Sequence, residues 1–113
     1  MSKPNRPVQW IAILCGLVAT ASQADTGSLT AFVEKTMVTA DASRGGCMMA
    51  LSADPASVLP ACKKTWVTFS CDGTYTDPVR AFRMLDQAQL AIATGMKVQI
   101  SFTDEKTHDG FCF

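Results

Sequence analysis

Four cysteines, Cys47, Cys62, Cys71 and Cys112, carry the clearest chemistry in this sequence of 113 residues. Thiols in this number in a small domain form either two disulfides or part of a metal site. A zinc site would be built on His108 and Cys112. Cys62 or Cys71 would add a further ligand, but the sequence lacks the Cys-x-x-Cys pair that structural zinc sites usually contain. We therefore predict two disulfides and no bound metal.

The sequence alone leaves three pairings of these cysteines open. Among them we favour Cys47–Cys62, which would join neighbouring strands. The second bridge would then be Cys71–Cys112, which would join the middle of the chain to its end. Each bridge would stabilise the fold by roughly 2–4 kcal/mol. Because a cysteine in a disulfide is not a nucleophile, we do not expect cysteine-protease chemistry.

His108 is the single histidine, and it lies in a charged run that begins at Asp104. General-base catalysis would need a nucleophile or a substrate pocket beside it. The sequence contains no Gly-x-Ser-x-Gly elbow, glycine-rich phosphate loop or His-Glu-x-x-His motif. Asp104 and Glu105 are adjacent on a predicted turn, whereas paired-carboxylate hydrolysis needs two acids that face each other across a cleft. We predict a solvent-exposed turn histidine, no enzymatic activity and no cofactor.

A binding surface is another use for the polar and aromatic residues around residues 65–71. Trp66, Thr68 and Ser70 alternate along this segment, and Tyr75 follows in the next loop. Aromatic faces beside hydroxyls are suited to stacking on a sugar or a base. Packing of Trp66 in the core is the competing interpretation. We expect a binding module for a glycan or a protein. The alternative is a periplasmic monomeric structural or inhibitor-type protein with one protein partner.

Residues 1–24 have the pattern of a secretory signal peptide. Lys3 and Arg6 form a positive start, an apolar run follows, and Ser22-Gln23-Ala24 places small residues before a cut at Asp25. The apolar run is well short of the roughly 20 residues that a membrane-spanning helix needs. We therefore predict cleavage and export rather than a retained membrane anchor.

Cys15 lies inside the predicted signal peptide, so cleavage reduces five cysteines to four. A lipoprotein is not expected, because bulky Leu14 precedes Cys15 where a small residue is usual. Cleavage would leave residues 25–113 as one small domain, periplasmic or secreted. That domain has eight basic and ten acidic residues. With no net positive field, neither nucleic acid nor a membrane is predicted as a partner.

Alternating apolar residues and turn signals divide the domain into strands and one helix. Strands are predicted at residues 30–39, 47–52, 65–71, 96–103 and 111–113, after a loose N-terminus at residues 25–29. The last strand is short, which indicates either a short edge strand or a sequence that stops early.

The helix is predicted at residues 78–94, with Asp77 as its N-cap, Pro78 in its first turn and Gly95 at its end. An order of three strands, a helix and two strands is that of the OB-fold, a five-stranded Greek-key barrel. We therefore predict a mainly β, OB-like antiparallel barrel or sheet with two disulfides. An α+β sandwich is the alternative.

One side of the predicted helix is apolar and should face the core. Its members are Ala81, Met84, Leu85, Ala88 and Ile92, with Phe82 at the edge. Val79 and Leu90 instead lie among polar residues that include Arg83. They are either exposed apolar side chains or, with Arg83, a contact between subunits of a homo-oligomer.

Residues 82–100, with the sequence FRMLDQAQLAIATGMKVQI, follow Cys71 and a short turn. This segment resembles the helix and following strand in the binding subunits of ring-forming bacterial toxins such as subtilase cytotoxin and typhoid toxin. The similar features are Leu85, Gln87-Ala88, Thr94-Gly95, Val98 and Ile100, together with the spacing from Cys47 to Cys62.

The resemblance covers about half of the predicted mature domain and implies an OB-fold subunit that forms a ring. The toxin subunits are longer, and no glycan-binding residue can be carried over from them. The chain is also similar to uncharacterised exported proteobacterial proteins, through its segments from Trp66 to Cys71 and from Asp109 to Cys112.

Overall fold

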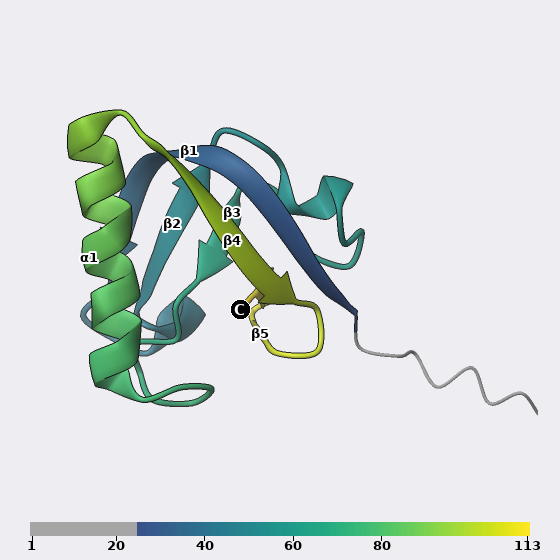
Figure 1. Ribbon diagram of the computed structural model, residues 1–113. Coiled ribbons are helices and arrows are strands. Elements are labelled where there is room, and N and C mark those ends of the chain that lie inside the picture. The colour runs from purple at the N-terminus through teal and green to yellow at the C-terminus, as the bar shows by residue number, and fades with distance from the viewer. Residues whose placement is uncertain (1–24) are drawn as a thin grey trace, which may run out of the picture.

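The computed structural model describes residues 25–113 (Figure 1). The predicted signal peptide, residues 1–24 with Cys15, lies outside the described residues. No helix within residues 25–113 has the length and apolar character needed to cross a membrane.

Four antiparallel strands form a curled, half-barrel sheet, with one helix along its side (Figure 1). The strands are β1 (Thr26–Val38), β2 (Cys47–Leu51), β3 (Trp66–Thr68) and β4 (Lys97–Thr103), in the order β3-β2-β1-β4. A separate hairpin follows, made of β5 (Thr107–His108) and β6 (Phe111–Cys112). The prediction of a mainly β fold with one helix is confirmed, but its count of five strands is wrong.

Strand β1 is long because its two halves pair with different strands. Its first half pairs with β4, from Thr26 opposite Thr103 to Phe32 opposite Lys97. Its second half pairs with β2, and the register shifts near Glu34. A bulge increases the local twist of a strand, which helps the sheet to curl. The loose N-terminus predicted at residues 25–29 is therefore wrong, since most of that segment belongs to β1.

Helix α1 spans Pro78–Thr94, which confirms the predicted helix. It could be predicted because the residues that begin and end it are close to it in the sequence. The Asp77 carboxylate accepts a hydrogen bond of 2.8 Å from the Val79 N–H, and Pro78 occupies the first turn. Gly95 ends the helix in the left-handed conformation at φ 65°.

The main core lies between the inner face of the sheet and helix α1. From the helix it contains Ala81, Leu85, Ala88 and Ala91, and from the sheet chiefly Ala31, Val33, Met49, Leu51 and Val67. Ile92, which was predicted to face the core, is 41% exposed, and Phe82 is 46% exposed. The sheet covers only a narrow strip of the helix surface, and both side chains lie beside that strip.

Strand β3 is shorter than the predicted strand at residues 65–71. Thr65 and Ser70 have φ values of 74° and 55°, which extended strands do not adopt. Strand β3 is therefore confined to the residues between Thr65 and Ser70. Two single-turn 3-10 helices, η1 (Ser43–Gly45) and η2 (Pro55–Ser57), occupy the loops around β2.

Two disulfides are present, which confirms the prediction of disulfide bonds, but the favoured pairing is wrong. Cys47 bonds to Cys71 across the β2–β3 pair, with their Cα atoms 5.6 Å apart. The second disulfide, Cys62–Cys112, has a Cα separation of 5.4 Å. Cys62 pairs with Cys112 rather than with Cys47 because its loop lies against the C-terminal hairpin, where the Lys63 N–H donates to the Gly110 carbonyl. Such bonds indicate a non-cytoplasmic, oxidising environment.

Candidate functional site

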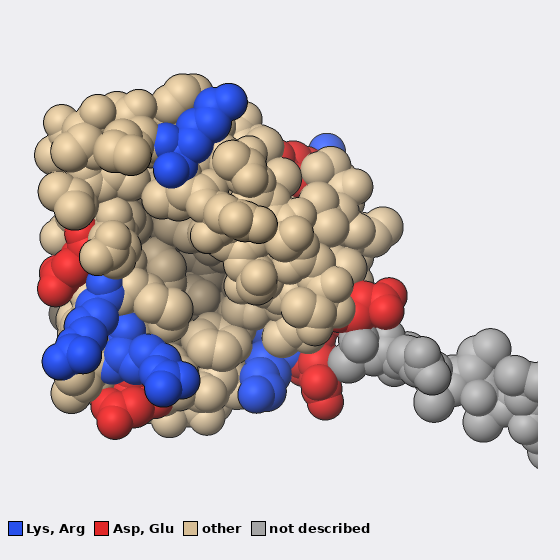
Figure 2. All heavy atoms as spheres, viewed as in Figure 1, with Lys and Arg blue, Asp and Glu red and all other residues tan. Residues whose placement is uncertain are grey.

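A cavity of about 650 Å³ opens between helix α1, strand β4 and the end of β3. Its size is within the range of ligand-binding pockets, roughly 300–1,000 Å³. In the space-filling view it is a hollow beside the helix, surrounded mostly by uncharged residues (Figure 2). Its apolar walls include Met49, Val67, Phe69, Met84, Val98 and Ile100.

The cavity exists because the half-barrel does not close. Strands β3 and β4 are the two edges of the sheet, and no strand of the described chain joins them across the opening. The helix covers β1 and β2, so the interior near β4 keeps an open side. Apolar side chains that a closed barrel would bury there instead face the cavity.

Polar groups are sparse around the opening. Gln87 reaches it from the helix, and Gln99 and Ser101 border it at the edge of β4, where they alternate with inward-facing Val98 and Ile100. Lys106 is the single charged residue that lines the cavity among residues 25–113, and it lies in the loop after β4. The site therefore offers an apolar interior, the Gln87 amide and the main-chain edge of β4 at its rim, and one positive charge at one end.

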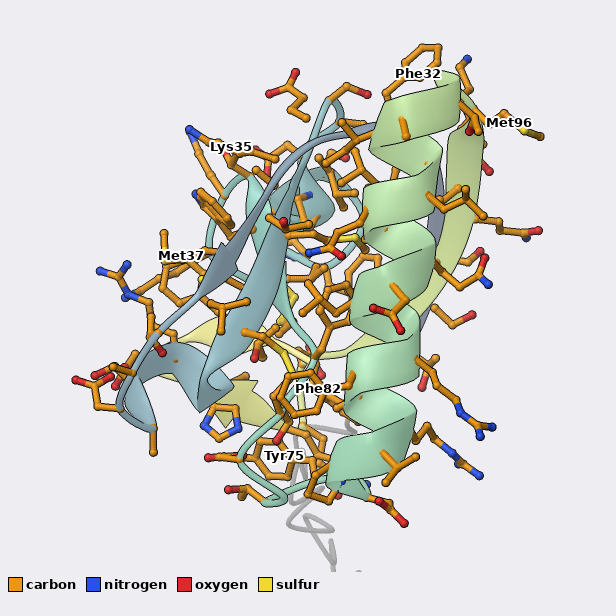
Figure 3. The ribbon with its side chains drawn as sticks, turned by 90° about the vertical axis from the view of Figure 1, so that its left-hand side faces the viewer. Phe32, Lys35, Met37, Tyr75, Phe82 and Met96 are labelled. Atoms are coloured by element: carbon orange, nitrogen blue, oxygen red, sulfur yellow. A yellow bond between two sulfur atoms is a disulfide. The ribbon has the colours of Figure 1, made fainter. Side chains whose placement is uncertain are left out.

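A second group of interacting side chains lies where β3 ends. The Ser70 hydroxyl lies 2.9 Å from the Asp72 Oδ1 atom, 2.9 Å from the His108 Nε2 atom and 3.2 Å from the Tyr75 N–H. The Tyr75 ring packs against His108 at a centroid distance of 4.7 Å. Figure 3 shows Tyr75 at the lower end of the molecule, at the opposite end from Met96.

Asp72 is the charged member of this network. Partial burial by itself raises the pKa of the Asp72 carboxyl, but hydrogen bonds from Thr74 and Ser70 outweigh this effect. The neighbouring His108 acts in the same direction as these hydrogen bonds. The pKa of Asp72 therefore lies below its ordinary value of 3.8.

A serine, a histidine and an aspartate close together resemble a hydrolase triad, but their geometry is different. In a triad the aspartate contacts the histidine nitrogen remote from the serine. Here Asp72 Oδ1 accepts a hydrogen bond of 2.9 Å from the Ser70 hydroxyl and lies 3.7 Å from His108 Nε2, the nitrogen that also contacts the serine. Ser70 is also fully buried. The network joins β3 to the C-terminal hairpin, and it leaves no free nucleophile.

His108 was predicted to be a solvent-exposed turn residue, and this is wrong. Its side chain is 13% exposed, because Tyr75 and Ser70 pack against it. Gly45 makes room for this packing. A Cβ atom at Gly45 would lie 2.8 Å from the His108 ring.

The predicted binding residues do not form one surface. Thr68 and Ser70 are buried, with exposed fractions of 3% and 0%, because η1 and the C-terminal hairpin cover them. Trp66 is half-buried on the outer side of the sheet, and the Lys35 ammonium lies 5.4 Å from its ring centroid. Figure 3 shows Lys35 and Met37 on that outer side, away from the helix. Tyr75 belongs to the Ser70 network.

The residues predicted as an oligomer contact are accessible. Val79 is 60% exposed and Leu90 55% exposed, and Arg83 is exposed on the same helix. Their exposure agrees with both interpretations of the sequence. A contact between subunits remains a prediction.

The cysteines that a zinc site would need are all in disulfides. Cys62 and Cys112 are bonded to each other, and Cys71 is bonded to Cys47, so none of them is a free thiolate. Within residues 25–113, no group of three histidine, cysteine or acidic side chains is placed to hold a metal ion.

No protein-family model, no curated protein and no solved structure matches this chain.

The cavity is the feature of the site that could not be predicted from the sequence. The strand over residues 96–103 was predicted from its alternation, and Val98, Ile100 and Phe102 of that strand line the cavity. Nothing local in the sequence indicates that the sheet stays open beside them.

Proposed function

We propose that this protein is a non-catalytic binding module whose ligand places an apolar group in the cavity beside β4. The observation that carries the proposal is the open, apolar cavity of about 650 Å³ with a single charged lining residue, Lys106. Natural ligand sites combine an apolar interior with a few polar groups that orient the ligand. The Gln87 amide, the Lys106 ammonium and the free main-chain groups at the edge of β4 would supply those polar groups.

A protein ligand fits this site better than a glycan. Saccharides need several hydroxyl or charged partners and an accessible aromatic ring, whereas Thr68 and Ser70 are buried. The ring of Trp66 already has Lys35 above it. An apolar cavity favours a ligand with aliphatic or aromatic groups.

We further propose that the chain is exported, with residues 1–24 as a signal peptide, and that its domain is OB-like. The two disulfides support export, since such bonds persist in oxidising compartments. A helix between the third and fourth strands, and a long β1 shared by two partners, support the OB-like assignment. A homo-oligomer formed through Val79, Arg83 and Leu90 remains part of the proposal.

The uncharged fluorescent dye Nile red tests the cavity as a binding site. We expect saturable binding with one dye molecule per chain and a blue-shifted emission. Gln87→Trp should block the opening, and Gln89→Trp, on the same exposed helix but away from the cavity, serves as its control. Loss of binding in the first variant alone supports the proposal. If the wild type does not bind the dye, or if both variants bind it equally well, the cavity is not the binding site.

A further inference from the structure

We infer that the ligand is an extended polypeptide segment with an acidic residue at one end, which adds as a strand to the outer edge of β4. This inference rests on the proposed function, because the segment would place its apolar side chains in the cavity beside that edge. Strand addition is a common mode of peptide recognition, in which main-chain hydrogen bonds supply affinity and side-chain pockets supply specificity.

The hydrogen-bond pattern of β4 shows which of its residues face outward. The Asp104 N–H donates to the Asp25 carbonyl at 3.2 Å, on the side of β1. Partners in an antiparallel pair alternate between hydrogen-bonded and non-hydrogen-bonded positions. Lys97, Gln99 and Ser101 therefore direct their main-chain N–H and C=O groups away from β1. Within residues 25–113, the N–H groups of Gln99 and Ser101 have no hydrogen-bond partner on that side.

The outer edge of β4 already makes one main-chain hydrogen bond, at its C-terminal end. The Thr103 N–H donates to the main-chain oxygen of Phe113 at 2.8 Å, away from β1. An added strand would continue this pairing toward Lys97. The free edge from Lys97 to Ser101 has a rise of about 3.4 Å per residue, which suits a ligand strand of about five residues.

The cavity lies on the inner side of the same edge. Because side chains alternate between the two faces of a strand, every second residue of the added segment would point inward. Those residues would contact Met49, Phe69 and Met84, which line the cavity. The inward positions should therefore be aliphatic or aromatic, and the outward positions can be polar.

Charge complementarity fixes the chemistry of one end of the ligand. Lys106 lines the cavity beside the Ser101 end of the free edge, and no acidic residue among residues 25–113 lines it. Val98 and Ile100 keep the rest of the wall uncharged. An aspartate or glutamate at the end of the segment near Lys106 would face the one charged residue of the cavity wall.

A synthetic peptide of alternating valine and threonine, with aspartate at one end, tests the inference. Amide hydrogen exchange of the full chain by NMR should show slower exchange at Gln99 and Ser101 on peptide addition. The Ile100 amide, which faces β1, serves as an internal control. Binding without protection of Gln99 and Ser101 would overturn strand addition.

Two matched variants of Gln99 separate the effect of its main-chain N–H from the effect of its side chain. Gln99→Pro deletes an outward N–H, which a strand edge tolerates, whereas Gln99→Ala keeps it. We expect at least tenfold weaker peptide binding for Q99P than for Q99A, because both variants lack the glutamine side chain and only Q99A keeps the N–H group. A depsipeptide with ester bonds in place of amides makes the same test on intact protein, should Q99P not fold. Equal binding of the depsipeptide and the amide peptide contradicts the inference.

Charge reversal tests the acidic end. Lys106→Glu should weaken binding of the aspartate peptide by about twofold to fivefold and favour a lysine-ended peptide, while Lys64→Glu, away from the cavity, should do neither. No change in K106E would contradict the charge assignment. Binding of Nile red with no binding of any peptide would refute strand addition and leave the proposed function intact. No binding of Nile red would refute the proposed function itself.

Discussion

The Ser70 hydroxyl lies 2.9 Å from Nε2 of His108, although 38 residues separate them in the sequence. This contact joins the end of β3 to the C-terminal hairpin, beside the covalent link from Cys62 to Cys112. Because the Ser70 hydroxyl donates its one hydrogen bond to Asp72, its contact with His108 requires Nε2–H as the donor. The hairpin is therefore positioned by a hydrogen-bond network as well as by a disulfide.

Replacement of His108 by alanine should lower the free energy of unfolding by about 1–2 kcal/mol, since it removes a hydrogen bond to buried Ser70 and the contact with Tyr75. Asp109→Asn, in the same hairpin but exposed, is the control and should have little effect. Urea denaturation of both variants measures the difference. Equal stability of His108→Ala and the wild type would show that the network contributes nothing to the fold.

The Asp72 carboxylate should make the free energy of unfolding depend on pH in the acid range. Its pKa is lowered in the folded state, so its contribution to stability is present above its ordinary pKa of 3.8 and is lost as the pH falls through the folded value. Asp72→Asn should be less stable than the wild type by about 1 kcal/mol at neutral pH. The two proteins should converge as the pH falls from 3.8 through the lower folded-state pKa of Asp72. Thermal unfolding across this pH range measures the difference, and a constant gap would contradict the assignment.

The two disulfides should be Cys47–Cys71 and Cys62–Cys112 in the purified protein. Mass spectrometry of unreduced proteolytic fragments reads this pairing directly. Loss of the second bridge in a Cys62→Ser and Cys112→Ser double variant should reduce stability by roughly 2–4 kcal/mol. A fragment that links Cys47 to Cys62 would show that the chain folds differently.

Two leucines of α1 provide a test of its orientation. Leu85 is 4% exposed, whereas Leu90 is 55% exposed. Leu85→Ala should destabilise the protein by about 2–5 kcal/mol, because it leaves a cavity in the core. Leu90→Ala should change stability by less than about 0.5 kcal/mol in a monomer. A large effect at Leu90 that grows with protein concentration would instead favour the oligomer.

Gly45 and Gly95 both have positive φ, at 82° and 65°, but their surroundings differ. A Cβ atom at Gly45 would lie 2.5 Å from the Thr68 hydroxyl oxygen, whereas one at Gly95 would have no neighbour within 4 Å. Gly95→Ala should therefore cost about 1 kcal/mol from backbone strain alone, and Gly45→Ala substantially more. Similar melting temperatures for the two variants would argue against the close packing of η1 on β3.

Helix α1 could be predicted from the sequence because its signals are local. Asp77, Pro78 and Gly95 define its ends within a few residues. The start of β1 could not be predicted, since Thr26 is extended only through its pairing with Thr103. Local alternation carries no information about a partner that lies so far along the chain.

The candidate site was less predictable than the fold. Alternation in the segment around β3 placed Thr68 and Ser70 on one face, but that face is covered by η1 and the C-terminal hairpin. The favoured disulfide pairing failed for a similar reason, because Cys62 packs against the hairpin rather than beside Cys47. Each error arose from contacts between segments that are distant in the sequence.

The division of β1 between two partners also has a consequence for how the chain folds. Val38 pairs with Cys47 in a short hairpin, and such local pairs form quickly. The first half, from Thr26 to Phe32, has no partner until β4 has been synthesised and released. During that interval it is an unpaired strand, open to association with other chains. The speed with which Thr26 meets Thr103 should therefore govern how much of the newly made protein aggregates.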